Sequence, residues 1–557
     1  MLKNRRNPGQ RWTSFAYFRE NAKPVNMNES SASSTPPRRM RWWLPAAILA
    51  LSALSIGTVR FSEAFEGKLR SQSSIALVLL TALLLAGWYV FLTGLRWRTR
   101  WTLLGMGAAL LLALVVGLRL TVRVDGSISG NGLPRLVWKW TPKIDAALPQ
   151  ITHELTNQKA ELSKATPEDF PQFLGAERKG VVTAARLARD WTAQPPRELW
   201  RQPIGPGWSS FAIVGKWAVT QEQRQDNEMT VCYELASGHV LWEHANKVRF
   251  GEALGGDGPR ATPTINAGRV YAFGATGILD CLDGATGKVL WTRDTLNEIK
   301  AQNPMYGKSS SPLLCDNLVV VTGGAEGPLL LAYDKDTGRP IWLSDNAGKC
   351  GYSSPVLATV AGKRQILSVN GASVTGHDPV DGRALWEFQW PGFYPKCSQP
   401  FAFGDDRIFI SAGYAVGCAL LQIKSTPGSN AFSASVLWKN RNLKTQFSNA
   451  VERGGFMYGL DDETLVCLEL ATGQRRWKEG HYSYGQVLLA DDLLLVQAES
   501  GELALVEANP NAYRELARLP ALSSKTWNNP ALAGEYLLLR NDREAVCYKL
   551  PLTAVRQ

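Results

Sequence analysis

Residues 332–342 read AYDKDTGRPIW, and this eleven-residue pattern recurs along the chain. Four further copies read CYELASGHVLW at 232–242, CLDGATGKVLW at 281–291, GHDPVDGRALW at 376–386 and CLELATGQRRW at 467–477. A small residue opens each copy, a glycine lies six positions on, and a tryptophan lies four positions after the glycine. Two degenerate copies keep only the tryptophan, so the repeated residues are Trp200, Trp242, Trp291, Trp342, Trp386, Trp438 and Trp477.

The spacing and the chemistry of this pattern predict repeated antiparallel β-strands. Successive tryptophans are 39 to 52 residues apart, and a repeat of this length is typical of the four-stranded blade of a β-propeller. Thr-Gly, Ser-Gly or Asp-Gly makes the turn in each full copy, where glycine adopts the positive φ that other side chains resist. We expect each tryptophan to lie flat across the turn of the neighbouring blade and to join blades that share no hydrogen-bond ladder.

A second signature precedes each unit and gives the number of blades. It is a pair of small or polar residues followed by proline, or a looser copy of this pattern. The prolines are Pro263, Pro312, Pro355, Pro400 and Pro530, and the looser copies begin at Trp208, Phe447 and Tyr484. Proline fits the start of a strand that faces a channel, where no ladder donor is needed. The eight copies predict eight inner strands, and hence an all-β eight-bladed propeller over residues 170–550.

The last unit, 527–550, ends before any outer strand, whereas residues 197–203 (RELWRQP) read as an outer strand with no blade before it. We predict that 197–203 completes the final blade and closes the ring, because closure removes free sheet edges.

The pattern A-x-D-x-x-T-G-x-x-x-W at 332–342 resembles the tryptophan-docking motif of pyrroloquinoline-quinone (PQQ) dehydrogenases and the repeats of the BamB family. Residues 170–182, FPQFLGAERKGVV, resemble the lead-in of PQQ-like propeller proteins. The resemblance covers residues 168–550 and implies the PQQ-like, or quinoprotein-type, propeller fold. It does not by itself imply an activity, because one fold hosts many functions.

The net charge of +12 is not evidence for a nucleic-acid partner, because it is concentrated at one end of the chain. Residues 1–124 contain 17 Lys and Arg against 4 Glu, and the remaining residues are close to neutral. Basic residues placed in this way are typical of segments that flank a membrane, not of a phosphate-binding surface. We therefore expect an integral membrane protein that binds no nucleic acid.

Residues 42–120 read as an α-helical transmembrane region with helices at about 43–59, 75–95 and 101–118, each near the ~20 residues that span a bilayer. Residues 1–41 are polar and predict a disordered cytoplasmic tail, in which Met27 is an alternative start to Met1. Arginines at 38–41 and 96–100 lie on the cytoplasmic side by the positive-inside rule. Three spans then place the propeller outside the cytoplasm. We therefore expect a protein of the bacterial inner membrane whose propeller lies in the periplasm. If one segment is instead a buried helix, the orientation inverts.

Residues 121–169 read as a linker or stalk between the membrane and the propeller. Residues 133–142 (LPRLVWKWTP) are extended and aromatic, and 144–164 are charged with apolar spacing, which predicts a helix.

The channel mouth is the predicted binding site. Aromatic residues and lysines recur just before the inner strands, and the lysines (at 308, 349, 396, 444 and 525) would form a basic rim. The candidate ligand- or partner-binding residues are Trp208, Arg260, Lys308, Tyr352, Lys396, Phe447, Tyr484 and Trp527. Such a mouth favours an acidic peptide or a small anionic ligand. The alternative is that the aromatic residues pack between blades and the lysines are solvated loop charges.

Two functions follow from these features. The first is a binding scaffold that resembles the BamB family, with an envelope protein or a small anionic ligand as partner and with no catalytic residue, metal or cofactor assigned. The second is a PQQ-dependent membrane quinoprotein dehydrogenase that oxidises an alcohol or sugar, with calcium holding the quinone. The resemblance to quinoproteins is incomplete, because the chain has no adjacent cysteines, no CxxCH and no long insertions between blades. A ligand sensor that signals through residues 120–169 is a third hypothesis.

Overall fold

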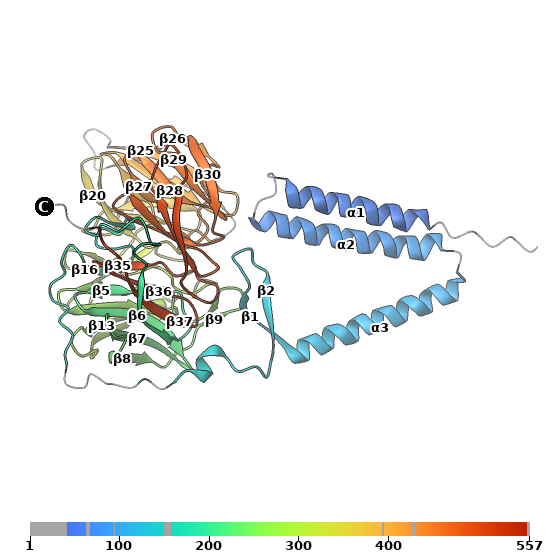
Figure 1. Ribbon diagram of the computed structural model, residues 1–557, viewed down its shortest axis with the longest axis horizontal. Helices are drawn as coiled ribbons and strands as arrows, with labels where there is room; N and C mark the ends of the chain where they lie inside the picture. Colours follow the sequence, from blue (N-terminus) through green and yellow to red (C-terminus); the bar gives the residue numbers. More distant parts are fainter. Residues whose placement is uncertain are drawn as a thin grey trace, which may run out of the picture.

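The computed structural model describes residues 42–553, except 63–66, 94, 150, 152–157, 393–394 and 426–430. The tail predicted at 1–41 lies outside the described residues. The described chain contains long N-terminal helices, a small hairpin and a propeller of eight blades (Figure 1). The prediction of an eight-bladed propeller preceded by apolar helices is confirmed.

The helices are α1 (Trp43–Phe61), α2 (Gly67–Leu92) and α3 (Trp97–Thr121). All three are long and apolar enough to cross a membrane, by their length and composition. The first two lie side by side, and the hydroxyls of Ser52 and Thr81 are 2.5 Å apart between them. Helix α3 then runs back from the far end of α2 to the propeller (Figure 1).

A hairpin follows α3 directly. Its strands are β1 (Val122–Ser127) and β2 (Pro134–Trp138), paired antiparallel with Val122 opposite Trp138. The helix predicted at 144–164 is wrong: within the described part of this range, only the 3-10 turn η1 (Ile144–Ala147) is helical. The apolar residues Ala160 and Leu162 are instead buried against the first two blades, so their spacing reflects packing on the propeller and not a helix.

In each of the first seven blades, four antiparallel strands follow one another along the chain from the inner to the outer position. The first four blades are β5 (Ala212–Val214), β6 (Trp217–Arg224), β7 (Asn227–Glu234) and β8 (Val240–Asn246); β11 (Thr264–Asn266), β12 (Arg269–Phe273), β13 (Ile278–Asp283) and β14 (Val289–Asp294); β15 (Leu313–Cys315), β16 (Leu318–Thr322), β17 (Leu330–Asp334) and β18 (Pro340–Leu343); and β19 (Val356–Val360), β20 (Lys363–Val369), β21 (Ser373–His377) and β22 (Ala384–Gln389).

The next three blades are β23 (Phe401–Phe403), β24 (Arg407–Ala412), β25 (Gly417–Ser425) and β26 (Phe432–Asn440); β27 (Val451–Arg453), β28 (Phe456–Asp461), β29 (Thr464–Glu469) and β30 (Arg475–His481); and β31 (Gln486–Ala490), β32 (Leu493–Gln497), β33 (Glu502–Glu507) and β34 (Glu515–Pro520). Short additional elements are β3 (Val181–Val182), β9 (Gly251–Glu252), β10 (Gly256–Asp257) and the helical turn α4 (Thr295–Glu298).

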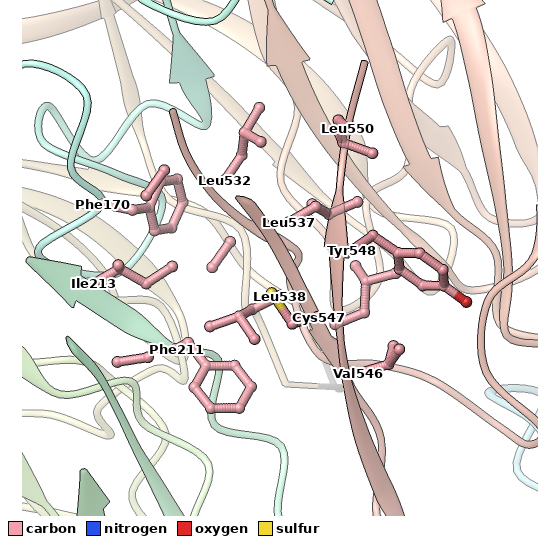
Figure 2. Packing of buried hydrophobic residues seen from close by; sticks show 14 of the residues in the cluster. Phe170, Phe211, Ile213, Leu532, Leu537, Leu538, Val546, Cys547, Tyr548 and Leu550 are labelled. Carbon is pink, nitrogen blue, oxygen red and sulfur yellow. The ribbon is translucent and has the colours of Figure 1, made fainter. Parts of the chain in front are cut away.

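The eighth blade joins the two ends of the propeller. Strands β35 (Ala531–Ala533), β36 (Tyr536–Arg540) and β37 (Glu544–Lys549) receive β4 (Arg197–Pro203) as their outer strand, with Trp200 opposite Cys547. Figure 2 shows the packing at this junction, where Phe170, Phe211 and Ile213 lie near the leucines of β35 and β36. The ring is therefore closed by strand pairing and by a shared apolar core.

The repeated tryptophans join neighbouring blades. The indole N–H of Trp242 donates to the carbonyl of Gly284 in the next blade at 2.9 Å, and a Cβ placed on Gly287 would lie 2.7 Å from Cδ2 of the indole. The same donor reaches a carbonyl of the next blade from Trp200, Trp291, Trp342, Trp438 and Trp477. Trp386 differs, because its indole donates to Gln365 of its own blade and the following blade lacks the eleven-residue pattern.

Candidate functional site

A ring of hydrogen bonds links the inner strands just before they begin. The main-chain nitrogen of Ser210 donates to the hydroxyl of Thr262 at 3.0 Å, that of Thr262 to Ser311 at 2.9 Å, and that of Ser311 to Ser354 at 2.9 Å. These hydroxyls belong to the residues before the proline in the sequence signature. The small polar residues therefore fix the distance between blades at the channel.

Longer amide side chains continue the ring where the signature departs from Ser-Ser-Pro. They are Gln399, which bonds Ser354 and Asn449; Gln486, which bonds the carbonyls of Phe447 and Trp527; and Asn528, which bonds the carbonyl of Ser209. The ring thereby passes through all eight blades. Its members are buried, and their hydrogen bonds offset part of the cost of holding polar groups away from water. The side-chain oxygens of Gln399, Gln486 and Asn528 are buried without a hydrogen-bond partner.

Residues 170–182 cross the channel beyond this ring. Phe170 pairs with Ile213 of the first blade, and β3 pairs in parallel with β31 of the seventh. Between them the buried Arg178 donates to the carbonyls of Ser311 and Pro312 of the third blade, and burial lowers its pKa to about 9. The lead-in segment thus forms a floor across the channel.

A cavity of about 180 Å³ lies at the mouth, between this floor and the entry loops of the inner strands. Seven of its twenty lining residues are aromatic, and several of these rings touch: Trp208 and Trp527 have centroids 4.8 Å apart, and Phe447 lies 5.0 Å from Trp527. Tyr352 lines the opposite part, 5.7 Å from the ring of Tyr306. The cavity suits an apolar or aromatic group on an extended ligand.

Arg260 contributes a cation to the wall. Its guanidinium donates to the carbonyls of Gly256 and Gly258 and lies 4.6 Å above the ring of Phe250. Burial lowers the pKa of Arg260 to about 10, so it is charged at neutral pH. Among the described residues that line the cavity, none is Asp or Glu.

The tip of the β1–β2 hairpin enters this mouth and is held there by its main chain. The nitrogen of Gly130 donates to Oε1 of Glu499 at 2.7 Å, and its carbonyl accepts from the side-chain amide of Gln446 at 2.8 Å. The carbonyl of Ser127 accepts from Nζ of Lys525 at 2.7 Å. The mouth therefore already contacts one peptide segment, the chain's own hairpin tip, through the main-chain donors and acceptors of that segment.

The close approach of the tip requires glycine. A Cβ placed on Gly130 would lie 2.9 Å from Cε2 of Phe447 and nearer still to the ring of Tyr484. Lys525, which holds the tip, also lies 4.0 Å above the ring of Trp527 and 5.2 Å from that of Trp208. Burial lowers the pKa of Lys525 to about 8.

Charged contacts hold the segment that follows the hairpin against the propeller. Lys143 pairs with Asp257 at 2.9 Å and Asp145 with Arg249 at 2.6 Å, while Arg224 donates to the carbonyl of Pro149 at 2.8 Å. The segment that follows α3 is thus attached to the first blade as well as to the mouth.

Of the eight residues predicted at the mouth, the structure places five in the wall of the cavity: Trp208, Arg260, Tyr352, Phe447 and Trp527. Tyr484 lies under Gly130, with its hydroxyl buried and without a hydrogen-bond partner. The other two, Lys308 and Lys396, do not form a basic rim.

Both lysines are buried and fold back onto main-chain carbonyls. The ammonium of Lys308 donates to Thr322 and Gly323, and that of Lys396 donates to Gly371. Burial lowers the pKa of Lys308, and lowers that of Lys396 to about 8. In each case the next residue, Ser309 or Cys397, lines the cavity. Because neighbouring side chains of an extended chain point to opposite sides, the lysines point away from the channel.

Three parts of the site were not predicted from the sequence: the hairpin tip, Gln446 and Glu499. A signal for the tip was present, since residues 126–132 (GSISGNG) separate two apolar, β-branched segments, which is typical of a hairpin. The contacts with Gln446 and Glu499 join residues more than 300 positions apart, and a single sequence carries no signal for them.

The residues present do not fit a calcium-bound quinone. Calcium takes about six to eight oxygen ligands, with carboxylates prominent among them. Three carboxylates near the mouth are already engaged: Glu252 accepts from the nitrogens of Leu254 and Gly255, Asp257 pairs with Lys143, and Glu499 holds the hairpin. Among the residues that the structure describes, no group of three His, Cys, Asp or Glu side chains could hold a metal ion.

Comparisons with known proteins agree with this architecture. The family model described as outer membrane protein assembly factor BamB matches residues 193–320 and 225–479, together just over half of the chain. The chain is 22% identical over 332 residues to the outer membrane protein assembly factor BamB of Shewanella oneidensis, which covers 57% of this chain and 80% of that protein.

Quinoproteins are similar over a shorter stretch or in fold alone. The chain is 28% identical over 138 residues to the quinoprotein alcohol dehydrogenase PedH of Pseudomonas putida, which is 23% of this chain and 22% of that protein. The quinohemoprotein alcohol dehydrogenase of Comamonas testosteroni superposes with a TM-score of 0.53 at 11% identity, covering 70% of this chain and 82% of that one. This last likeness shows a common fold.

Proposed function

The chain belongs to the propeller family described as outer membrane protein assembly factor BamB, and from that premise we propose that it is a membrane-anchored scaffold that binds a partner protein of the cell envelope. Helices α1, α2 and α3 cross the inner membrane, and the propeller lies on the periplasmic side. Their length and apolar composition support the anchor, and the basic residues at 96–100 support the orientation.

The observation that carries this proposal is the way the mouth holds the hairpin tip. Propeller side chains bind the main-chain nitrogen and carbonyl of Gly130 and the carbonyl of Ser127, and aromatic rings surround them. Main-chain hydrogen bonds give affinity for a peptide, and pockets beside them give specificity. The mouth is therefore a site for a glycine-containing turn of a partner, which displaces the chain's own hairpin tip.

A PQQ-dependent dehydrogenase is the second candidate, favoured by the similarity to PedH over 138 residues. The residues that line the mouth argue against a PQQ-dependent dehydrogenase. Among the described cavity-lining residues there is no carboxylate to hold calcium or to act as the general base of an alcohol oxidation.

The test uses a peptide with the sequence of residues 124–136 (VDGSISGNGLPRL), labelled with a fluorophore and titrated into the purified full chain. The variant Gly130→Val expels the chain's own tip by the clash with Phe447 and Tyr484 and leaves the mouth open. We expect the peptide to bind this variant at micromolar concentration and to bind the unaltered chain far more weakly. The same peptide carrying valine at the position of Gly130 is the matched control and should not bind.

The protein control is Gly105→Val in α3, where an added Cβ meets nothing within 4 Å; it should behave as the unaltered chain. If the peptide binds neither the open variant nor the unaltered chain, the mouth is not a peptide site and the proposal fails. Where the peptide binds the open variant, a photo-cross-linker at Tyr352 identifies the envelope protein that competes with this peptide in cells.

A further inference from the structure

The β1–β2 hairpin has two faces of opposite character. On one face Asp125 pairs with Arg135 at 2.8 Å, and both border a small polar cavity together with Lys525. On the other face Val124 lies opposite Leu136 in the strand register. Leu136 is 62% exposed and is followed two residues later by Trp138, 52% exposed. The polar face is turned to the propeller, whereas the apolar face is open.

Trp140 extends the apolar face beyond the end of β2. It is 67% exposed and stacks on Trp138 with ring centroids 5.0 Å apart and an interplanar angle of 6°. Two large indoles stacked in the open form an exposed apolar patch of the kind that marks a binding surface. With Val124 and Leu136 they make up what we call the apolar face of the hairpin.

This face adjoins the end of the last apolar helix. Strand β1 begins at the residue after α3 ends. The main-chain nitrogen of Lys139 donates to the carbonyl of Thr121 at 2.8 Å, and its ammonium donates to the carbonyl of Arg119 at 2.6 Å. The stacked tryptophans on either side of Lys139 are therefore fixed beside the last turn of α3.

We infer that the apolar face of the hairpin lies in the headgroup layer of the same bilayer that α3 crosses. Tryptophan is enriched at this depth, and Arg119 and Lys139 supply cations where the lipid phosphates lie. Because the hairpin tip enters the channel mouth, this placement turns the mouth toward the membrane. A partner's segment then reaches the mouth along the membrane surface. The inference rests on the membrane anchor of the proposed function.

The experiment places an environment-sensitive fluorophore at Leu136→Cys in the full chain, reconstituted in nanodiscs of phosphatidylethanolamine and phosphatidylglycerol. Cys397→Ser is the background, since it replaces the one described cysteine that is only half-buried. The matched control is Val380→Cys, 80% exposed on the turn between β21 and β22, at the other end of the propeller. Quenching is measured with nitroxide-labelled lipids and with aqueous iodide.

We expect the label at 136 to show blue-shifted emission and several-fold stronger quenching by headgroup nitroxide than the label at 380, and iodide to show the reverse. Equal quenching of both labels by iodide would overturn the inference. Protection of the label at 136 from both quenchers would also overturn it, because a protein surface such as a second copy would then cover the face. Alkaline carbonate extraction reports separately on the anchor: release of the chain from the membrane counts against the proposed function itself.

Discussion

The main-chain nitrogen of Gly130 and the carboxylate of Glu499, 369 positions apart, are joined by a hydrogen bond of 2.7 Å. Glu499 also accepts from the hydroxyl of Ser129 at 2.8 Å and from the indole of Trp527 at 2.7 Å. One buried carboxylate thereby connects the segment that follows the apolar helices to the last two blades of the propeller. Together with the hydrogen bonds from Gln446 and Lys525, this contact holds the chain's own hairpin tip in the mouth.

Replacing Glu499 by glutamine should loosen the hairpin tip. A neutral amide loses the charge-assisted hydrogen bonds, and its N–H group faces the donors of Ser129 or Gly130. The cost is about 2 kcal/mol, which shifts the equilibrium between the bound and the released hairpin tip roughly thirtyfold toward release. Hydrogen exchange of the Gly130 amide measures this directly. Glu502→Gln is the control, because Glu502 pairs with Arg518 on the outside of the same blade. Unchanged exchange at Gly130 in Glu499→Gln would contradict the assigned role.

The packing of tryptophan on a turn glycine can be tested with two glycines of similar φ. Gly382 (φ +77) would place a Cβ 2.7 Å from Cδ2 of Trp342, whereas Gly362 (φ +74) would place one in open space. Gly362→Ala should lower the free energy of unfolding by about 1 kcal/mol from the left-handed backbone alone. Gly382→Ala should lower it by about 3 kcal/mol, because overpacking against the indole is added. Tryptophan fluorescence during thermal unfolding compares them, and equal midpoints would argue against the packing role.

The fold could be predicted from the sequence because the repeat places the same physical constraint in five of the eight blades. In each full copy the turn glycine lies four positions before the tryptophan, as Gly382 lies before Trp386, and the indole of the preceding blade, here Trp342, packs on that glycine. The entry signature before each inner strand was equally visible, although its hydrogen-bond ring emerged only from the structure. The strand at 197–203 stood out because it had no blade before it.

The candidate site could be predicted only in part from the sequence. The aromatic wall followed from the register of the repeats, but Lys308 and Lys396 were assigned to the rim because they adjoin wall residues, and a shift of one residue reverses the direction of a side chain. The contact of Gly130 with Glu499 depends on how the hairpin folds back onto the ring. Such a contact between distant segments has no local pattern in a single sequence.

Glu228 on β7 should make the stability of the propeller depend on pH. Burial raises the pKa of its carboxyl from 4.5 to about 7, although Ala275 and Thr276 donate hydrogen bonds to it. Between these pH values the folded state binds more protons than the unfolded state, so stability falls as pH rises from 4.5 to about 7 and stays lower above it. The loss is at most about 3 kcal/mol.

Glu228→Gln removes this titration and keeps the shape of the side chain. Its thermal midpoint should match that of the unaltered chain at pH 5 and exceed it at pH 8.5. The paired control is Glu243→Gln, on the neighbouring strand β8. If the thermal midpoints of Glu228→Gln and the unaltered chain differ by the same amount at both pH values, the carboxyl does not titrate in this range.

Titration of the full chain with PQQ and calcium decides between the two candidate functions. The cavity-lining residues that the structure describes offer amides and hydroxyls but no carboxylate, and the tip of the hairpin fills part of the mouth. We therefore expect no stoichiometric, calcium-dependent change in quinone absorbance and no dye reduction with alcohols or sugars. The open variant Gly130→Val should give the same result, because emptying the mouth adds no ligand for calcium. Stoichiometric binding with turnover in either protein would contradict the scaffold proposal. The first candidates for quinone or metal contacts would then be the amides of Asn449 and Asn529, which line the cavity.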